Sequence, residues 1–552
     1  MKKAFDFVRR QFTWPECATA AILFVLLFID RSTARDNLMG INIKGWIWYF
    51  YALIPWFALS LVPMLALGKW SRYAYYIILP VIILCDSILL FVRINFNMQL
   101  DGDIVGIVLA SSEGEIKWFF SQYFGPALLM VAAAVLCLAT FSAWIASRLM
   151  HAAVSKFKVI CSMAAALLFF ILLPVFSEGA RVFDDLPFVF LITDSVAQFS
   201  GFQELASMKS RPKLPQDIAR AEELGANSIG VFVLGESSTR NRWSLYGYGR
   251  KTTPCLDGLE DELVVFDNVV APVSSTASAM KLILTTATVE NADDCRYTFP
   301  QVLSKAGVRA ALYSSHARFG RWDGCEIFAF AGCDPIVFTG EHGHGEIVYD
   351  DILLQYLGDR MASCTNCNSV VFLHLMGSHM SANERYPHDG VPFEPEQIVR
   401  SRDLADLGKM QNHYDNSIWF TDKILGQIID SLKQRGGVSW MVYLSDHGET
   451  PGSNRWRWSS DRDLWEVPMV VWVSDEYKAR FPATYAALKM SSHKPLQSDE
   501  LLAGLLHIAG IRGGGVGTEV DFLDNRFAPR KERVIESGKK MYTWEKPQLK
   551  RD

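Results

Sequence analysis

Residues 442–452 read VYLSDHGETPG, an apolar run that stops abruptly at an acid, an imidazole and a glycine. The run extends back to residue 438 as VSWMVYL, which is typical of a short strand buried inside a parallel sheet. In such sheets, ligands bind beyond the carboxyl ends of the strands. Asp446 and His447 are therefore candidate site residues.

Four further apolar runs alternate with helix-like polar stretches downstream of residue 228. They read IGVFVLGE (229–236), RAALYSS (309–315), SVVFLHLMG (369–377) and VPMVVWVS (467–474). This alternation predicts an α/β domain with a mixed, mostly parallel sheet covered by helices.

Three of these runs end in side chains that can bind an ion or move a proton. Glu236 ends the first run, His374 and His379 lie at the end of the third, and Asp446 with His447 ends the opening stretch. Each could be a helix-cap neighbour or a satisfied core histidine if taken alone. Because several strand ends carry such groups, the sequence predicts one common site.

The N-terminal third is far more apolar than the rest of the chain. The 552 residues are 50% hydrophobic and 12% aromatic, which is high for a soluble protein. Five apolar runs approach or exceed the roughly 18–20 residues that span a bilayer. They cover residues 12–29, 46–67, 73–92, 126–147 and 159–176. We expect a membrane domain over residues 1–176, with the first run retained because it lacks a small-residue cleavage site.

Loop charges predict the orientation of these spans. Basic residues precede the first span and lie in the second and fourth connections, whereas acidic residues dominate the third. By the positive-inside rule, an odd number of spans then places everything after residue 176 outside the cytoplasm. Residues 177–228 are interpreted as an interfacial segment and linker, and residues 229–552 as the exported domain. A net charge of −5 without a basic, aromatic-rich stripe gives no indication of a nucleic-acid partner.

The cysteines agree with export. Six of the ten cysteines lie downstream of the apolar runs, and an even number in an oxidising compartment indicates disulfides. Local spacing favours two close pairs and leaves one distant pair. The expected pairs are Cys325–Cys333, Cys364–Cys367 and Cys255–Cys295. A zinc or redox motif is the alternative for the Cys-x-x-Cys spacing.

The candidate site has the chemistry of a divalent metal centre. Glu236, Asp446 and His447 supply two carboxylates and an imidazole, a set that zinc accepts. The segment VVAPVSSTASAMKLIL (269–284) adds hydroxyls just before a helical run, where helix amides favour an anion. Plain helix capping by those hydroxyls is the alternative.

An ordered set of motifs resembles one enzyme family. They are GESSTRNRWSLYGYGRKTTP (235–254), SSTAS (274–278), LMGSH (375–379), ERYP (384–387), YDNSIWFTD (414–422) and SDHGE (445–449). The set is similar to that of membrane phosphoethanolamine transferases, which include lipid A-modifying and mobile colistin-resistance enzymes of the alkaline phosphatase/sulfatase-like superfamily. The resemblance implies five transmembrane helices in the bacterial inner membrane and a periplasmic catalytic domain. We expect a monomer.

The resemblance also implies roles for individual residues. Zinc would be held by Glu236, Thr276, Asp446 and His447, with Thr276 as the nucleophile. His379 would act in catalysis and bind substrate phosphate. Further candidates for substrate binding are His374, Arg318, Arg321 and Glu115. Glu115 would meet the ethanolamine headgroup, although a solvated loop charge explains it equally well.

The implied reaction moves phosphoethanolamine from phosphatidylethanolamine to an envelope acceptor through a phospho-threonine intermediate. Lipopolysaccharide core, lipid A and periplasmic glucan all remain open as acceptors. Residues 450–468 lack a histidine that relatives acting on lipid A carry there, so a second zinc is not expected. A phosphoglycerol transferase and a non-catalytic glycolipid-binding membrane protein remain alternatives. A formylglycine sulfatase is disfavoured because residues 276–280, TASAM, contain neither the proline nor the arginine of that motif.

Overall fold

The chain divides into two compact units, Met1–Gly201 and Phe202–Asp552. The computed structural model describes residue 214 and residues 218–219, 227–292, 294–316, 328–339, 348–379, 382–395, 407–450, 462–513, 521–537 and 540–545. The five predicted spans therefore lie outside the described residues, as does Glu115. Within the described part of the chain, no helix combines the length and apolar character needed to cross a membrane.

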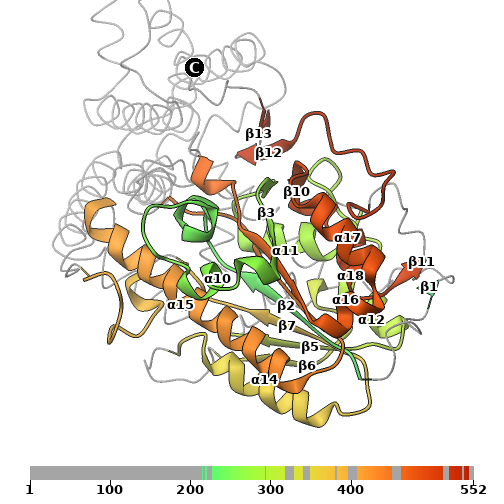
Figure 1. Cartoon of the computed structure of the whole chain (residues 1–552). Coiled ribbons are helices and arrows are strands. Elements are labelled where there is room, and N and C mark those ends of the chain that lie inside the picture. Colours follow the sequence, from blue (N-terminus) through green and yellow to red (C-terminus); the bar gives the residue numbers. More distant parts are fainter. Residues whose placement is uncertain are drawn as a thin grey trace, which may run out of the picture. The chain divides into compact units, whose positions relative to one another are not determined.

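A seven-stranded sheet lies at the centre of the second unit (Figure 1). Its order is β3-β9-β8-β2-β7-β5-β6. The strands are β2 (Ile229–Gly235), β3 (Leu263–Phe266), β5 (Arg309–Ser314), β6 (Cys333–Phe338), β7 (Ser369–His374), β8 (Ser439–Ser445) and β9 (Met469–Val473). In this sheet β9 runs opposite to the other six strands, which are parallel to one another. The prediction of a mixed, mostly parallel sheet is confirmed.

Three small two-stranded pairings complete the described strands. They join β1 (Ile218–Ala219) to β11 (Arg512–Gly513), β4 (Val269–Val270) to β10 (Leu496–Gln497), and β12 (Val534–Ser537) to β13 (Lys540–Thr543). Because β1 lies within residues 177–228, part of the segment predicted as a linker pairs with the α/β unit.

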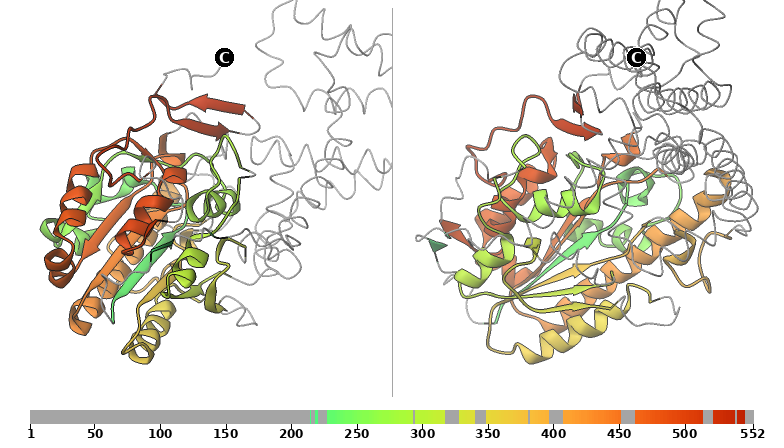
Figure 2. Two further views of the ribbon diagram at one scale, coloured as in Figure 1. Left: turned by 90° about the vertical axis from the view of Figure 1, so that its right-hand side faces the viewer. Right: turned by 180° about the vertical axis from the view of Figure 1, so that it is seen from behind.

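Helices cover both faces of the sheet, giving three layers (Figure 2). On one face lie α11 (Thr276–Leu284), α12 (Phe299–Lys305), α16 (Asp475–Arg480), α17 (Pro482–Ser491) and α18 (Leu502–Ile508). On the other lie α10 (Pro254–Asp257), α14 (Ile352–Ser363) and α15 (Leu407–Arg435). Alternate residues of β2 point to opposite layers, with Phe232 in the first core and Val231 in the second. A strand buried on both faces must be apolar throughout, which explains the unbroken run IGVFVLG.

The long helix α15 also anchors the start of α10. Both oxygens of the Asp422 carboxylate accept backbone N–H groups, from Cys255 at 2.8 Å and Leu256 at 2.9 Å. Burial raises the pKa of Asp422 to about 6, and these two hydrogen bonds offset part of that shift.

The cysteine predictions have mixed outcomes. The Cys364–Cys367 disulfide is confirmed. The Cys255–Cys295 pair is wrong, because Cys255 carries a free thiol on α10 whereas Cys295 is buried in the core on the opposite face of the sheet. Cys333 also carries a free thiol, which contradicts the Cys325–Cys333 pair, and Cys325 lies outside the described residues.

Candidate metal centre

The candidate residues gather where four adjacent parallel strands end. Glu236 follows β2, and Asp446 with His447 follows β8. His374 is the last residue of β7, and His316 lies two residues beyond β5. Since β8, β2, β7 and β5 are neighbours in the sheet, their carboxyl ends meet at one edge.

Glu236, Asp446 and His447 form what we call the first cluster. One potential ligand atom from each lies within 4.8 Å of the others. The His447 Nε2 atom is 3.6 Å from Glu236 Oε1 and 3.4 Å from Asp446 Oδ2. Both carboxylates are 0% exposed. Burial, reinforced by the charge of Asp446, raises the pKa of Glu236 well above its ordinary value.

Hydrogen bonds orient the first cluster toward a cation. The Nδ1 of His447 lies 2.8 Å from the carbonyl oxygen of Gly448. A carbonyl can only accept, so Nδ1 carries the proton and the neutral ring has its lone pair on Nε2. Asp446 Oδ1 accepts the N–H groups of Ser237 and His447, whereas its buried Oδ2 accepts no hydrogen bond from the described residues. Two carboxylates and one imidazole nitrogen thus converge on one point.

Thr276 brings a hydroxyl to this cluster. It is the first residue of α11, and its Oγ1 donates to Glu236 Oε2 at 2.9 Å. Ser275 occupies the helix-cap position in an extended conformation, yet its side chain makes no capping hydrogen bond. The alternative of plain helix capping is therefore not what these two side chains do. The residue as a whole is half-buried.

The loop after β2 is fixed by α15. The buried Tyr414 hydroxyl accepts the N–H of Thr239 at 3.0 Å and donates to the carbonyl oxygen of Ser237 at 2.7 Å. Ser445 Oγ accepts the N–H of Ser238 at 3.0 Å. Tyr414 belongs to the motif YDNSIWFTD (414–422), and Ser237 and Thr239 belong to the motif that begins GESST at residue 235. These contacts therefore join two motifs that lie far apart in the sequence.

The loop after β7 passes unusually close to Glu236. Gly377 has a φ of +49°, and a Cβ there would lie 2.8 Å from the Glu236 carbonyl oxygen. The N–H groups of Met376 and Gly377 donate to the buried Asp350 carboxylate at 2.8 and 2.9 Å. Ser378 N–H then donates to the Glu236 carbonyl oxygen at 2.9 Å. Glycine is required at position 377 by both space and backbone conformation.

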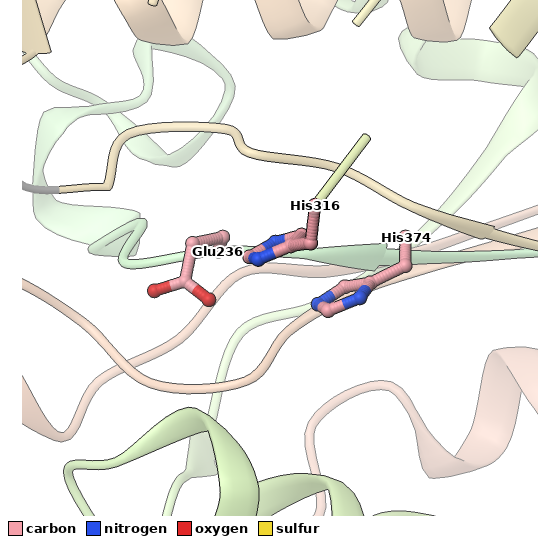
Figure 3. A group of neighbouring side chains, drawn as sticks. All are labelled: Glu236, His316 and His374. Carbon is pink, nitrogen blue, oxygen red and sulfur yellow. The ribbon is translucent and has the colours of Figure 1, made fainter. Parts of the chain in front are cut away.

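Glu236 also belongs to a second cluster, with His316 and His374 (Figure 3). One potential ligand atom from each of these three lies within 4.8 Å of the others. His379 is half-buried, and its ring centroid is 6.4 Å from that of His316 in an edge-on arrangement. Arg318 and Arg321 lie outside the described residues.

His316 is the residue of this region that sequence reasoning missed. The signal was present, because His316 directly follows the apolar run RAALYSS, as the other candidates follow theirs. In that segment only Arg318 and Arg321 were predicted to have a role, as contacts for the substrate.

Family comparison agrees with the fold. A family model described as Sulfatase matches residues 228–511, just over half of the chain. The chain belongs to the sulfatase family. The matched region contains every residue of both clusters.

Curated relatives of this sulfatase-family chain are named as phosphoethanolamine transferases. EptA of Helicobacter pylori is 28% identical over 269 residues, covering 46% of this chain and 49% of that protein. EptC of Escherichia coli O18:K1:H7 is 27% identical over 272 residues, covering 46% and 47%. The Kdo(2)-lipid A phosphoethanolamine 7''-transferase of Salmonella typhimurium is 25% identical over 270 residues, covering 46% of each. The chain thus spans about half the length of these relatives, and the resemblance read from the motifs is confirmed.

Solved structures share the fold. The integral membrane lipooligosaccharide phosphoethanolamine transferase A from Neisseria meningitidis has a TM-score of 0.68 at 19% identity, covering 92% of this chain and 97% of that one. The periplasmic domain of Escherichia coli EptC, also solved in complex with Zn, has a TM-score of 0.52 at 23% identity, covering 61% and 97%.

Proposed function

We propose that the chain transfers phosphoethanolamine from phosphatidylethanolamine to an envelope glycan or glycolipid. The observation that carries this proposal is the position of Thr276. A hydroxyl nucleophile lies 2.9 Å from Glu236, at the start of a helix and beside two buried carboxylates and an imidazole. The names of the relatives support phosphoethanolamine as the transferred group and a lipopolysaccharide component as the acceptor.

The first cluster fits zinc. Its oxygen and nitrogen donors suit a borderline divalent ion, and the unbonded Asp446 Oδ2 and the lone pair on His447 Nε2 are directed where an ion would sit. Glu236, Asp446, His447 and Thr276 would hold it. When bound, zinc lowers the pKa of a coordinated hydroxyl and neutralises charge that develops on phosphoryl oxygens.

The transfer is a double displacement at phosphorus. Thr276 Oγ1 forms a bond to the donor phosphorus while the bond from phosphorus to the diacylglycerol oxygen breaks. The hydroxyl proton leaves along the hydrogen bond to Glu236, and diacylglycerol departs with a proton from His379. An oxygen of the acceptor then attacks the same phosphorus and loses its proton to His379, while the bond from phosphorus to Thr276 Oγ1 breaks and Thr276 takes back its proton from Glu236.

We further propose that residues 1–176 form a membrane domain and that the catalytic unit lies in the periplasm. A shared fold over 92% of the chain with an integral membrane protein supports the first statement, and the periplasmic EptC domain supports the second. A membrane anchor suits a lipid donor. His374, Arg318, Arg321 and Glu115 remain proposed contacts for the donor or acceptor.

The test uses the purified full-length chain in vesicles that contain phosphatidylethanolamine. We expect diacylglycerol release and transfer of phosphoethanolamine to lipopolysaccharide core, lipid A or glucan added in turn. Thr276→Ala should abolish both, whereas Ser278→Ala, which removes an exposed hydroxyl from the same helix turn, should retain both. Diacylglycerol release by Thr276→Ala at the wild-type rate would refute the proposal. Transfer of glycerol phosphate from phosphatidylglycerol instead would favour the phosphoglycerol alternative.

A further inference from the structure

We propose that Glu236, His316 and His374 form a second divalent cation site beside the first. This inference concerns ion binding and does not depend on which group the enzyme transfers. All three side chains are buried, with exposures of 0%, 6% and 0%. One ligand atom of each falls within 4.8 Å of the others, and Figure 3 shows both imidazoles beside the Glu236 carboxylate.

Each imidazole makes a hydrogen bond through one ring nitrogen, as metal-binding histidines usually do. The Nε2 of His316 lies 3.0 Å from the carbonyl oxygen of Leu375, so Nε2 carries the proton and Nδ1 carries the lone pair. The Nδ1 of His374 lies 3.2 Å from Ser314 Oγ, which also accepts the N–H of His316. Metal-binding histidines commonly carry such a hydrogen bond on the ring nitrogen that does not bind the ion.

The local charge favours a cation over protonated histidines. Three buried carboxylates lie nearby: Glu236 belongs to the cluster, Asp446 lies beside Glu236, and Asp350 interacts electrostatically with His316. One divalent ion would balance Glu236 and Asp446. A second would leave the site positive, as an anionic phosphodiester requires.

The shared Glu236 carboxylate makes the pair of sites a binuclear centre. Glu236 has two oxygens, one receiving Ser237 Oγ at 2.6 Å and the other Thr276 Oγ1 at 2.9 Å. Such a carboxylate can bridge two ions at the separation used in two-metal phosphoryl transfer. His316 thus supplies an imidazole from the end of β5, and the second site needs no histidine from residues 450–468.

Binding should rearrange one ring. The rings of His316 and His374 are stacked, with centroids 4.0 Å apart and planes 7° apart. An ion binds in the plane of an imidazole, so two parallel rings cannot both point at it. We expect the His374 ring, whose contact with Ser314 Oγ is the longer of the two hydrogen bonds, to turn about its last side-chain torsion and to exchange that bond for the ion.

The experiment counts zinc ions bound by the full-length protein after chelation and dialysis, by calorimetric titration and elemental analysis. Wild-type protein should bind two equivalents. His316→Gln and His374→Gln should each bind one, as should Asp446→Asn through loss of the first cluster. The matched control is His493→Gln, which removes an exposed histidine outside both clusters and should keep two. Thermal melts of the chelated proteins establish that each variant is folded.

The outcomes separate this inference from the proposed function. One equivalent in wild-type protein, unchanged in His316→Gln, would overturn the second site and leave the first intact. No zinc in any protein would overturn both. Loss of both equivalents from a folded His316→Gln protein would assign His316 to support of the first cluster, which would also contradict a separate second site.

Discussion

The Asp446→Asn substitution should change stability in opposite directions with and without zinc. Asparagine keeps the oxygen that accepts the N–H groups of Ser237 and His447, and it replaces the unbonded Oδ2 with an uncharged amide. Two unit charges 4.8 Å apart, the separation limit within the first cluster, repel by about 3.5 kcal/mol at an effective dielectric constant of about 20. The raised pKa of Glu236 relieves part of this repulsion, so we expect the zinc-free variant to gain about 1–3 kcal/mol.

With zinc the order should reverse. An ion at about 1,000 times its Kd stabilises a folded protein by about 4 kcal/mol, and a variant that binds about 1,000-fold more weakly loses nearly all of that. Thermal melts in chelator and in excess zinc measure both effects, at roughly 2 °C per kcal/mol for a unit of this size. Asp499→Asn is the control. It removes a buried carboxylate that accepts the N–H of Val289 and pairs with Arg530, and should destabilise equally in both conditions. Either of two results would refute the reasoning: a lower stability of Asp446→Asn in chelator, or stabilisation of Asp446→Asn by zinc that equals that of the wild type.

Three other substitutions probe the loops after β2 and β7 and the contact between α15 and α10. Tyr414→Phe should lower the free energy of unfolding by about 1–3 kcal/mol and weaken zinc binding, because two hydrogen bonds to the loop after β2 are lost. Tyr477→Phe is the control, because the Tyr477 hydroxyl donates to Ile508 in the core on the other face of the sheet. It should lower stability by a similar amount without affecting zinc binding. Gly377→Ala should cost about 1–3 kcal/mol and reduce turnover, measured by denaturation and diacylglycerol release, and full retention of both would contradict the close approach to Glu236. Asp422→Asn tests linkage: a folded-state pKa of about 6 against an ordinary 3.8 means that wild-type stability is fully present in acid and falls as pH rises through 4 to 6. Urea denaturation should therefore show that the difference in stability between variant and wild type shifts by about 2 kcal/mol in favour of the variant between pH 4 and 7. A pH-independent difference would contradict the assignment.

Strand ends were the strongest signal in the sequence. The five apolar runs downstream of residue 228 correspond to β2, β5, β7, β8 and β9. They were recognisable because strands buried on both faces leave no freedom for polar residues. The strands β3 and β6 were missed. Both lie at the edges of the sheet, where β3 has only four residues and β6 is mostly half-exposed and contains Pro335. Edge strands carry weaker patterns because one side has no partner strand.

The site itself was predictable in its residue types but not in all of its members. Glu236, Asp446 and His447 were identified as strand-end groups, and the structure brings them within 4.8 Å of one another. Thr276 was named through family resemblance, since a hydroxyl at a helix start is ambiguous by itself. Cysteine spacing found Cys364–Cys367, where only two residues lie between the partners, but it could not show that Cys255 and Cys295 lie on opposite faces of the sheet.

The central claim is that Thr276 carries the transferred group. Tandem mass spectrometry of the full-length protein, quenched soon after mixing with phosphatidylethanolamine vesicles and no acceptor, tests it most directly. We predict a phosphoethanolamine ester on the Thr276 hydroxyl that disappears when acceptor is added. An ester on any other residue, or transfer that proceeds with Thr276 unmodified, would contradict the account.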